Sequence, residues 1–301
     1  VDWGKLEEGI HGDAARTPKK ALLPHQKQAL ELTHEHFKEN ERGKLIMACG
    51  TGKTFTALRI AEKLAGTGKR VLVLVPSLAL IAQTVREWTN DAEVRLRSFA
   101  VCSDSQVGKR RISNNDIAEI EAHELDFPAT TNAHKLYERA SLTDNERMTV
   151  CFSTYQSIPV ITAAQQAGLQ AFDLVICDEA HRTTGAKIEG EEDSNFVRVH
   201  DDKHVNALKR LYMTATPRIF GENARAKAAE ASVELCDMDD ETIYGPTFFT
   251  RGFSWAVENG LLTDYKVVVL AMDETVVSRS VQNRLAADNE LKLDNATKII
   301  G

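Results

Sequence analysis

The chain of 301 residues lacks the features that mark several large classes of protein. No apolar run approaches 18 residues, and the N-terminus has no basic stretch followed by an apolar one, so the sequence supports neither a membrane protein nor a secreted one. We therefore expect a cytoplasmic protein with no membrane partner. No internal repeat is visible. The 43% hydrophobic and 27% charged residues are typical of a globular protein, and the length is sufficient for a full α/β core.

The cysteines are few, and no two of them form a Cys-x-x-Cys pair. Each lies in or beside an apolar run, which predicts buried thiols in a reducing compartment, without disulfide or metal roles. The five cysteines are Cys49, Cys102, Cys151, Cys177 and Cys236.

An excess of positive charge is also missing, since the formal net charge is −7. This argues against a wholly basic surface for nucleic acid but leaves room for a local groove. The densest basic run, Gly108 to Arg111, fits either a phosphate contact or a solvated loop. The acidic run Glu189 to Asp193 has no metal-ligand spacing and is interpreted as a solvated loop.

A glycine-rich stretch, Met47 to Thr54, stands between an apolar run and an amphipathic segment. This order predicts a strand, a phosphate-binding loop and a helix. Gly50 and Gly52, with Thr51 between them, let backbone N–H groups turn toward one point, and the helix that follows directs the positive end of its dipole there. The natural ligand of such a loop is a nucleoside triphosphate.

Two side chains directly after the last glycine fit that ligand. Lys53 is suited to bridge the β- and γ-phosphates, and the hydroxyl of Thr54 is suited to ligate Mg²⁺. We therefore predict ATP and Mg²⁺ as cofactors. The general pattern has glycine where this chain has Met47. The alternative is a tight connection between a strand and a helix that binds nothing.

A second apolar run, Phe172 to Cys177, ends on two adjacent acids about 125 residues after the loop. At the carboxyl edge of a parallel sheet, Asp178 can hold Mg²⁺ through its water shell, and Glu179 can orient and deprotonate the attacking water. The alternative is that both acids cap the next helix, because acids favour helix N-termini.

In chain order, these two motifs and four further stretches resemble the superfamily 2 helicases and translocases of the Asp-Glu-Ala-His type. The four stretches are Leu23 to Gln26, Val71 to Ser77, Phe152 to Gln156 and Thr214 to Thr216. A closer resemblance is to the helicase-like module of type I and type III restriction enzymes, and within it to the type ISP restriction-modification proteins. The runs that carry it are Phe152 to Ile158, Cys177 to Gly185, Arg210 to Arg218, Met238 to Glu241 and Tyr244 to Pro246.

The resemblance implies further site residues. It assigns adenine recognition to Gln26, whose amide can pair with adenine. It implies that His181 relays between the ATP site and a coupling turn, although a core histidine is the alternative. The coupling turn consists of Thr214, Ala215 and Thr216. The implied nucleic-acid contacts are Pro76, Ser77, Gln83, Ser153, Thr154, Tyr155 and Gln156.

Short β-branched runs alternate with segments of helical period, which predicts a mostly parallel sheet with helices on both faces. With the resemblance, the predicted fold class is α/β, a RecA-like P-loop domain. The six predicted strands are 44–48, 70–75, 98–102, 149–153, 172–177 and 210–213. The predicted organisation is a linker, 1–19, a RecA-like ATP-binding domain, 20–262, and the start of a second RecA-like domain, 263–301. Residues 103–148 are predicted to be an insertion or long loop with weak helices at 116–124 and 132–140.

These patterns together predict an ATPase, the motor domain of an ATP-dependent DNA helicase or translocase in a restriction-modification enzyme, with double-stranded DNA as partner. The start at Val1 and the absence of a stop signal near Gly301 indicate a piece of a larger chain. The resemblance implies a nuclease upstream, and the rest of the second RecA-like domain and a methyltransferase downstream. Because no arginine motif follows Tyr265, we expect weak activity from this piece alone. The alternatives are an RNA helicase of the same fold and a nucleotide-gated interaction module without motor activity.

Overall fold

The computed structural model describes residues 19–102, 129–142, 144–188, 194–222, 226 and 233–264. The chain divides into two compact units, Val1–Leu262 and Thr263–Gly301. Of the second unit, only Thr263 and Asp264 are among the described residues. Several predicted features lie outside them: the linker up to residue 18, the basic run 108–111, the weak helix 116–124, the acidic loop 189–193 and everything from residue 265 onward. The predicted domain boundaries remain a prediction.

The first unit is built on one parallel sheet. Within the described residues it has eight strands in the order β10-β1-β8-β6-β2-β5-β3-β4, and every neighbouring pair runs parallel. The strands are β1 (Arg42–Met47), β2 (Arg70–Val75), β3 (Leu96–Val101), β4 (Ala129–Thr130), β5 (Met148–Thr154), β6 (Leu174–Cys177), β8 (Arg210–Thr214) and β10 (Thr247–Arg251). The predicted α/β class with a mostly parallel sheet is confirmed.

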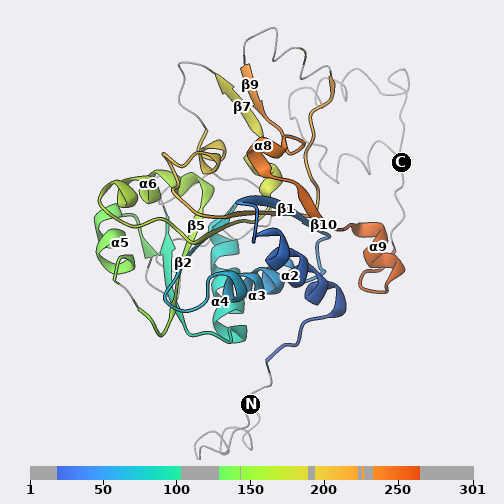
Figure 1. Cartoon of the computed structure of the whole chain (residues 1–301), viewed down its shortest axis with the longest axis horizontal. Helices are drawn as coiled ribbons and strands as arrows, with labels where there is room; N and C mark the ends of the chain where they lie inside the picture. The colour runs from blue at the N-terminus through green and yellow to red at the C-terminus, as the bar shows by residue number, and fades with distance from the viewer. Residues whose placement is uncertain are drawn as a thin grey trace, which may run out of the picture. The chain divides into compact units, whose positions relative to one another are not determined.

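Both faces of the sheet are buried. Consecutive residues of β2 pack into two different apolar clusters: Val73 lies with Ile60 and Trp88 on one face, and Leu72 lies with Leu136 on the other. Figure 1 shows the corresponding layers, with α2 (Pro24–His36), α3 (Lys53–Leu64) and α4 (Leu78–Asp91) on one side and α5 (Ala133–Ala140) and α6 (Ile158–Gln166) on the other. Burial on both faces explains why these strands are continuous apolar runs.

The strand predictions hold with small shifts at their ends. The range Arg70–Val75 matches β2 as predicted, and β6 begins two residues later than predicted. Phe172, the residue where that strand was expected to start, instead forms an isolated parallel bridge with Ala207. The helix predicted at 132–140 is present as α5. Since β4 and α5 belong to the sheet and its covering layer, this part of the predicted insertion is an integral part of the fold.

Besides the two-residue strand β4, three strands were missed by the sequence analysis. One is β10, which pairs with β1 at the edge of the sheet and leads into the short helix α9 (Phe253–Glu258). The other two are β7 (Gly185–Ile188) and β9 (Val233–Cys236), which form a separate antiparallel pair. A four-residue helix, α8 (Glu241–Tyr244), stands between β9 and β10.

None of the helices that the structure describes combines the length and the apolar character that a membrane crossing requires.

Candidate nucleotide-binding and catalytic site

The glycine-rich loop connects the end of β1 to the start of α3. Gly50 and Gly52 have φ angles of 79° and 83°, in the left-handed region that glycine adopts without strain. Thr51 closes the turn between them, because its hydroxyl donates a hydrogen bond to Ala48 O at 2.7 Å. The first N–H groups of α3 have no partners inside the helix, and together with the helix dipole they favour an anion at this end. These features favour the binding of an anion at this loop, as the sequence predicts.

Gln26 lies directly against this loop. Its Nε2 donates to Thr51 O at 3.0 Å, and Nε2 of the neighbouring His25 lies at the same distance from that oxygen. A Cβ atom added at Gly52 would lie 2.3 Å from Gln26 Nε2, so a larger residue here would have to displace the amide from its present position. The predicted base reader is thus adjacent to the predicted phosphate site.

The acidic pair follows β6, two strands away from β1 in the sheet. Asp178 N donates to Leu74 O at 2.9 Å, and the hydroxyl of Tyr155 donates to Asp178 O at 2.7 Å, which fixes the backbone at this point. Glu179 has a φ of 50°, the only positive φ of a non-glycine residue in the described part of the chain. Its side chain makes no capping hydrogen bond to the helical turn that follows, contrary to the capping alternative.

The loop and the acidic pair meet across a short gap. Lys53 Nζ lies 3.7 Å from Glu179 Oε1, which brings together residues about 125 positions apart in the chain. The pKa of Asp178 is raised from 3.8 to about 6, mainly by burial and secondly by the charge of Glu179, while the charge of Lys53 opposes both effects. An incoming anion could replace the carboxylates as the partner of the Lys53 ammonium. An incoming cation could replace the ammonium as the partner of the two carboxylates.

The oxygen atoms available here suit Mg²⁺. The hydroxyl of Thr54 and the carboxylate of Asp178 are hard ligands of the kind this ion prefers. The described residues include no group of three or more His, Cys, Asp or Glu side chains that could hold a metal by themselves. Mg²⁺ commonly binds through one or two protein ligands together with substrate phosphates. The donor set therefore fits an ion that enters with a triphosphate.

His181 links the acidic pair to the turn after β8. Its Nδ1 lies 2.9 Å from Thr214 Oγ1 and 3.3 Å from Glu179 Oε2. Thr214 Oγ1 also accepts a hydrogen bond from Thr216 N at 3.2 Å, while Ala215 between them is half-buried. Burial lowers the pKa of His181, which favours the neutral imidazole. The structure thus places the predicted relay between the two elements it was expected to join.

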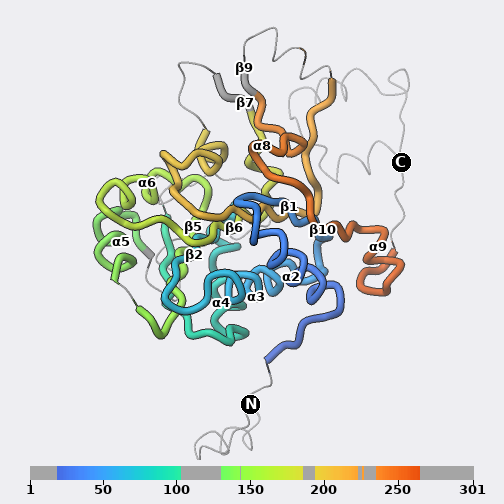
Figure 2. The backbone as a smooth tube through the Cα atoms, viewed as in Figure 1, coloured from blue at the N-terminus to red at the C-terminus, as the bar shows by residue number. Residues whose placement is uncertain are grey.

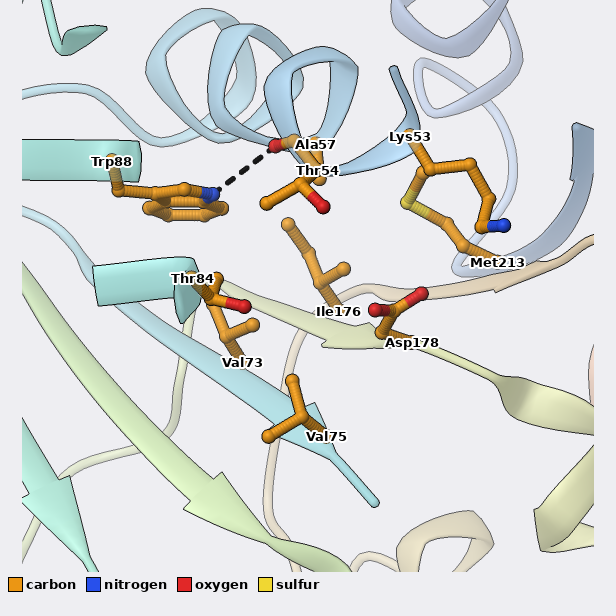
Figure 3. A pocket seen from close by; sticks show the side chains of 10 residues that line it. All are labelled: Lys53, Thr54, Ala57, Val73, Val75, Thr84, Trp88, Ile176, Asp178 and Met213. Carbon is orange, nitrogen blue, oxygen red and sulfur yellow. Dashed lines mark hydrogen bonds between the residues drawn. The ribbon is translucent and has the colours of Figure 1, made fainter. Parts of the chain in front are cut away.

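A small cavity of about 10 Å³ lies behind Lys53, Thr54 and Asp178 (Figure 3). That volume is close to the minimum for one water molecule and far too small for a nucleotide. On its far side the indole N–H of Trp88 donates to Thr54 O at 3.1 Å, which ties α4 to the first turn of α3. The sequence analysis missed Trp88, since one tryptophan on an amphipathic helix is indistinguishable from a packing residue.

The predicted nucleic-acid contacts differ in exposure. The side chains of Ser153, Thr154 and Tyr155 are fully buried in this structure, and their contact with nucleic acid stays a prediction. Tyr155 holds the backbone of Asp178, as described above, and Thr154 Oγ1 lies 2.9 Å from the hydroxyl of Ser157. Both faces of the sheet are covered, so every residue of β5 is buried up to its end at Thr154, and the motif alone did not indicate this.

The remaining predicted contacts are closer to the surface. Gln83 is exposed on α4 and donates to Glu87 Oε1 at 2.8 Å. Ser77, the N-cap residue of α4, and Gln156 are half-buried, and Pro76 is buried. Contact through side chains is therefore expected from Ser77, Gln83 and Gln156.

One cysteine also departs from the prediction. Four of the five free thiols are buried, but Cys49 is exposed in the phosphate loop. Lys53 Nζ lies 3.7 Å from its sulfur atom. The loop lies at the carboxyl ends of the strands, where the covering helices no longer enclose the chain. A residue that directly follows an apolar strand is therefore not necessarily buried.

Comparison with known proteins agrees with this geometry. Residues 19–219 match the protein family described as type III restriction enzyme, res subunit. The chain is 28% identical over 266 residues to the probable helicase A859L of African swine fever virus, a match that covers 86% of this chain and 25% of the viral protein. It is 25% identical to the type I restriction enzyme EcoAI endonuclease subunit of Escherichia coli, over 83% of this chain and 24% of that subunit.

Two solved structures are more similar in sequence. The ATP-dependent type ISP restriction-modification enzyme LlaBIII bound to DNA shares 43% identity with a TM-score of 0.67, over 92% of this chain and 18% of that one. A nuclease-deletion mutant of the type ISP enzyme LlaGI with a DNA substrate mimic shares 43% identity with a TM-score of 0.63, over 81% and 18% of the two chains. The present chain therefore spans about a quarter of these relatives' length or less.

Proposed function

This chain belongs to the family of type III restriction enzyme res subunits, and from that premise we propose that it is the ATP-hydrolysing motor domain of a DNA translocase or helicase. The proposal extends to the larger protein, which we propose is a restriction-modification enzyme with nuclease and methyltransferase regions elsewhere in its chain. The observation that carries it is the approach of Lys53 and Glu179 to 3.7 Å. This contact supports the proposal, because it brings an ammonium suited to bind phosphate next to a candidate general base.

In this mechanism the phosphate loop and Lys53 bind the triphosphate. The N-terminal end of α3 and the Lys53 ammonium stabilise the negative charge on the β- and γ-phosphates. Mg²⁺, held by Thr54 and by Asp178, would neutralise further charge on the phosphate oxygens as it develops. Tyr155 keeps the backbone of Asp178 fixed, so that its carboxylate is already oriented when the substrate arrives.

Glu179 then orients the attacking water. One of its oxygens faces Lys53 and the other faces His181. When Lys53 transfers its interaction to phosphate, the first oxygen becomes available to accept a proton from water in line with the γ-phosphate. Because His181 contacts Glu179 and Thr214, a shift of the turn after β8 would change the position of the base. This contact offers a physical route by which hydrolysis and nucleic-acid binding influence one another.

The assigned roles predict that substitution of Lys53 affects ATP binding, whereas substitution of Glu179 affects hydrolysis. Lys53→Ala removes the ammonium that faces the triphosphate, so we expect most ATP affinity to be lost. Glu179→Gln keeps the shape of the side chain but removes the base, so binding should remain and hydrolysis should fall. Titration of a fluorescent ATP analogue and assay of phosphate release on both variants measure the two effects. Lys38→Ala, at an exposed lysine paired with Glu35 on the surface, is the control.

Equal loss of ATP binding in both variants would contradict the assigned roles. Phosphate release with duplex DNA, duplex RNA and no nucleic acid, measured on the full-length protein, separates the remaining alternatives. We expect stimulation by DNA, because both type ISP relatives were solved with DNA or a DNA mimic. Stimulation by RNA alone would identify an RNA helicase of the same fold, and no stimulation by either would favour a nucleotide-gated module.

A further inference from the structure

Trp255 lies in a part of the fold that none of the sequence motifs includes. It belongs to α9, which begins directly after β10 at the edge of the sheet. The end of β10 is joined to the phosphate loop, because Ala48 N donates to Arg251 O at 2.9 Å. Figure 2 shows the backbone passing from β10 into α9, close to the end of β1. The carboxyl edge of the sheet therefore places α9 beside the loop, on the side away from the acidic pair.

The contacts of α9 confirm this neighbourhood. The ring of Trp255 meets the ring of His25 edge-on, with centroids 5.4 Å apart and an angle of 61°. His25 in turn contacts Thr51 O in the loop, next to Gln26. After α9 the chain returns to the loop, where Leu262 lies so close to Gly50 that an added Cβ would be 2.9 Å from Leu262 Cδ2. Trp255 is thus beside both the candidate base reader and the phosphate loop.

The indole ring of Trp255 is held in place and is only half-buried. The guanidinium of Arg251 lies over it at 5.1 Å and over the ring of Phe249 at 5.2 Å. Arg251 is itself fixed by donating to Gln28 Oε1 at 2.8 Å. The Arg251 cation and the T-shaped contact with His25 hold the indole in place, and the exposed part of its surface is available to another flat group.

Gln26 retains hydrogen-bonding capacity for the same group. Its amide has two donor hydrogens and two acceptor lone pairs. Its Nε2 donates to Thr51 O and its Oε1 accepts from Leu23 N at 2.9 Å. One donor and one acceptor therefore remain, which is the pair that adenine requires at N7 and the N6 amine.

From this arrangement we propose that Trp255 is the stacking platform for the adenine ring of ATP, beside the edge-reading amide of Gln26. The inference rests on the proposed ATP site and deepens it by assigning a base-specificity residue. Stacking on an indole favours a flat aromatic base of any kind, so Trp255 supplies affinity and Gln26 supplies discrimination. The phosphate chain is bound independently by the loop and Lys53.

The test compares two ligands that share the phosphate chain. A non-hydrolysable ATP analogue and tripolyphosphate, each with Mg²⁺, are titrated by calorimetry against the 301-residue chain. We expect Trp255→Ala to weaken binding of the ATP analogue about tenfold and to leave tripolyphosphate binding within about twofold, because only the former carries a base. Trp255→Phe, which keeps an aromatic face, should recover most of the affinity. Phe253→Ala on the same helix is the matched control and should bind both ligands as the original chain does.

Two results would overturn the inference. Equal weakening of both ligands by Trp255→Ala would show that the residue only supports the packing of α9 against the loop. Unchanged binding of the ATP analogue would show that the base lies elsewhere. If the original chain binds neither ligand, the proposed ATP site fails and the inference fails with it, whereas binding by the original chain without any effect at Trp255 overturns the inference alone.

Discussion

Replacement of Asp178 by asparagine should make the chain more stable while it removes the proposed ligand for Mg²⁺. The carboxylate is held at the end of β6 with a pKa of about 6 instead of 3.8, mainly because burial disfavours its charged form and because Glu179 adds like charge. At neutral pH, folding therefore buries the ionised Asp178 carboxylate, which lowers the free energy of unfolding. Asparagine has nearly the same shape and no charge, so it removes this penalty.

The magnitude follows from the shift. A pKa raised from 3.8 to about 6 corresponds to about 3 kcal/mol between the two protonation states, as an upper value. The folded state binds the proton more tightly than the unfolded state does. The penalty is therefore absent below about pH 4, grows as the pH rises toward 6 and is complete above it. The gain in the free energy of unfolding from Asp178→Asn should follow this curve.

Urea unfolding, followed by circular dichroism in the presence of a chelator, measures this gain at several pH values. Asp240→Asn is a control of opposite sign. Asp240 caps α8 and accepts hydrogen bonds from Thr242 N at 2.8 Å and Thr242 Oγ1 at 2.6 Å, and the Thr242 side chain is the main cause of its lowered pKa. That stabilisation is present above the unfolded-state pKa and is lost as the pH falls through the folded-state pKa, so Asp240→Asn should lower the stability at pH 8.

The reasoning would be refuted if Asp178→Asn left stability at pH 8 unchanged or reduced it, or if its gain were the same at pH 4 and pH 8. With Mg²⁺ and an ATP analogue added, the original chain should become more stable to unfolding than the Asp178→Asn variant. Ligand that binds only the folded state raises its stability, and the variant without the carboxylate should bind that ligand less tightly.

Two further substitutions probe the loop and the residue against it. Gln26→Ala should weaken ATP binding more than GTP binding, by about 1 to 3 kcal/mol, because guanine lacks a match for the amide; competition titrations measure the preference, and an unchanged ratio would count against Gln26 as base reader. Gly52→Ala should destabilise the chain more than Gly260→Ala, because both positions have positive φ but only Gly52 would place a Cβ 2.3 Å from the Gln26 amide. The backbone strain alone costs about 1 to 2 kcal/mol, and equal losses in urea unfolding would show that Gln26 moves aside freely.

The parts of the site that the sequence predicted are those in which a few neighbouring residues impose the geometry. The loop between Gly50 and Gly52 needs positive φ at both glycines, and the position of Lys53 at the start of α3 follows directly. The strand from Arg70 to Val75 was recognisable because a buried parallel strand is apolar on both faces. Local sequence was therefore sufficient for these elements.

The parts that were missed depend on contacts between distant residues. The edge strand β10 has only one buried position, Phe249, in its five residues, and its place beside β1 is set by pairing across about 200 residues. Its polar and aromatic composition gave no signal of a parallel strand. The consequence for the site is direct, since β10 is what brings Arg251 and Trp255 to the loop.

The burial of Ser153, Thr154 and Tyr155 has a similar origin. A motif specifies residue types but not which side of the strand end faces the solvent. Here the tyrosine hydroxyl reaches Asp178 O at 2.7 Å, so a segment expected at the nucleic acid supports the catalytic backbone instead. Because Gln156 lies next to Tyr155 and is half-buried, a nucleic acid that contacts Gln156 would act on the acidic pair through one residue.

An unfavourable backbone conformation and an unfavourable charge coincide at the acidic pair. Glu179 adopts a left-handed backbone, which costs a non-glycine residue about 1 to 2 kcal/mol, and Asp178 next to it carries a charge that burial opposes. Packing of β2, β6 and β8 does not require either feature, since the strands already end at Val75, Cys177 and Thr214. The left-handed backbone directs the Glu179 side chain toward Lys53 and His181, where the proposed mechanism requires it. We therefore expect Mg²⁺ and triphosphate, if they bind at the proposed site, to offset both unfavourable features and to raise the stability of the chain.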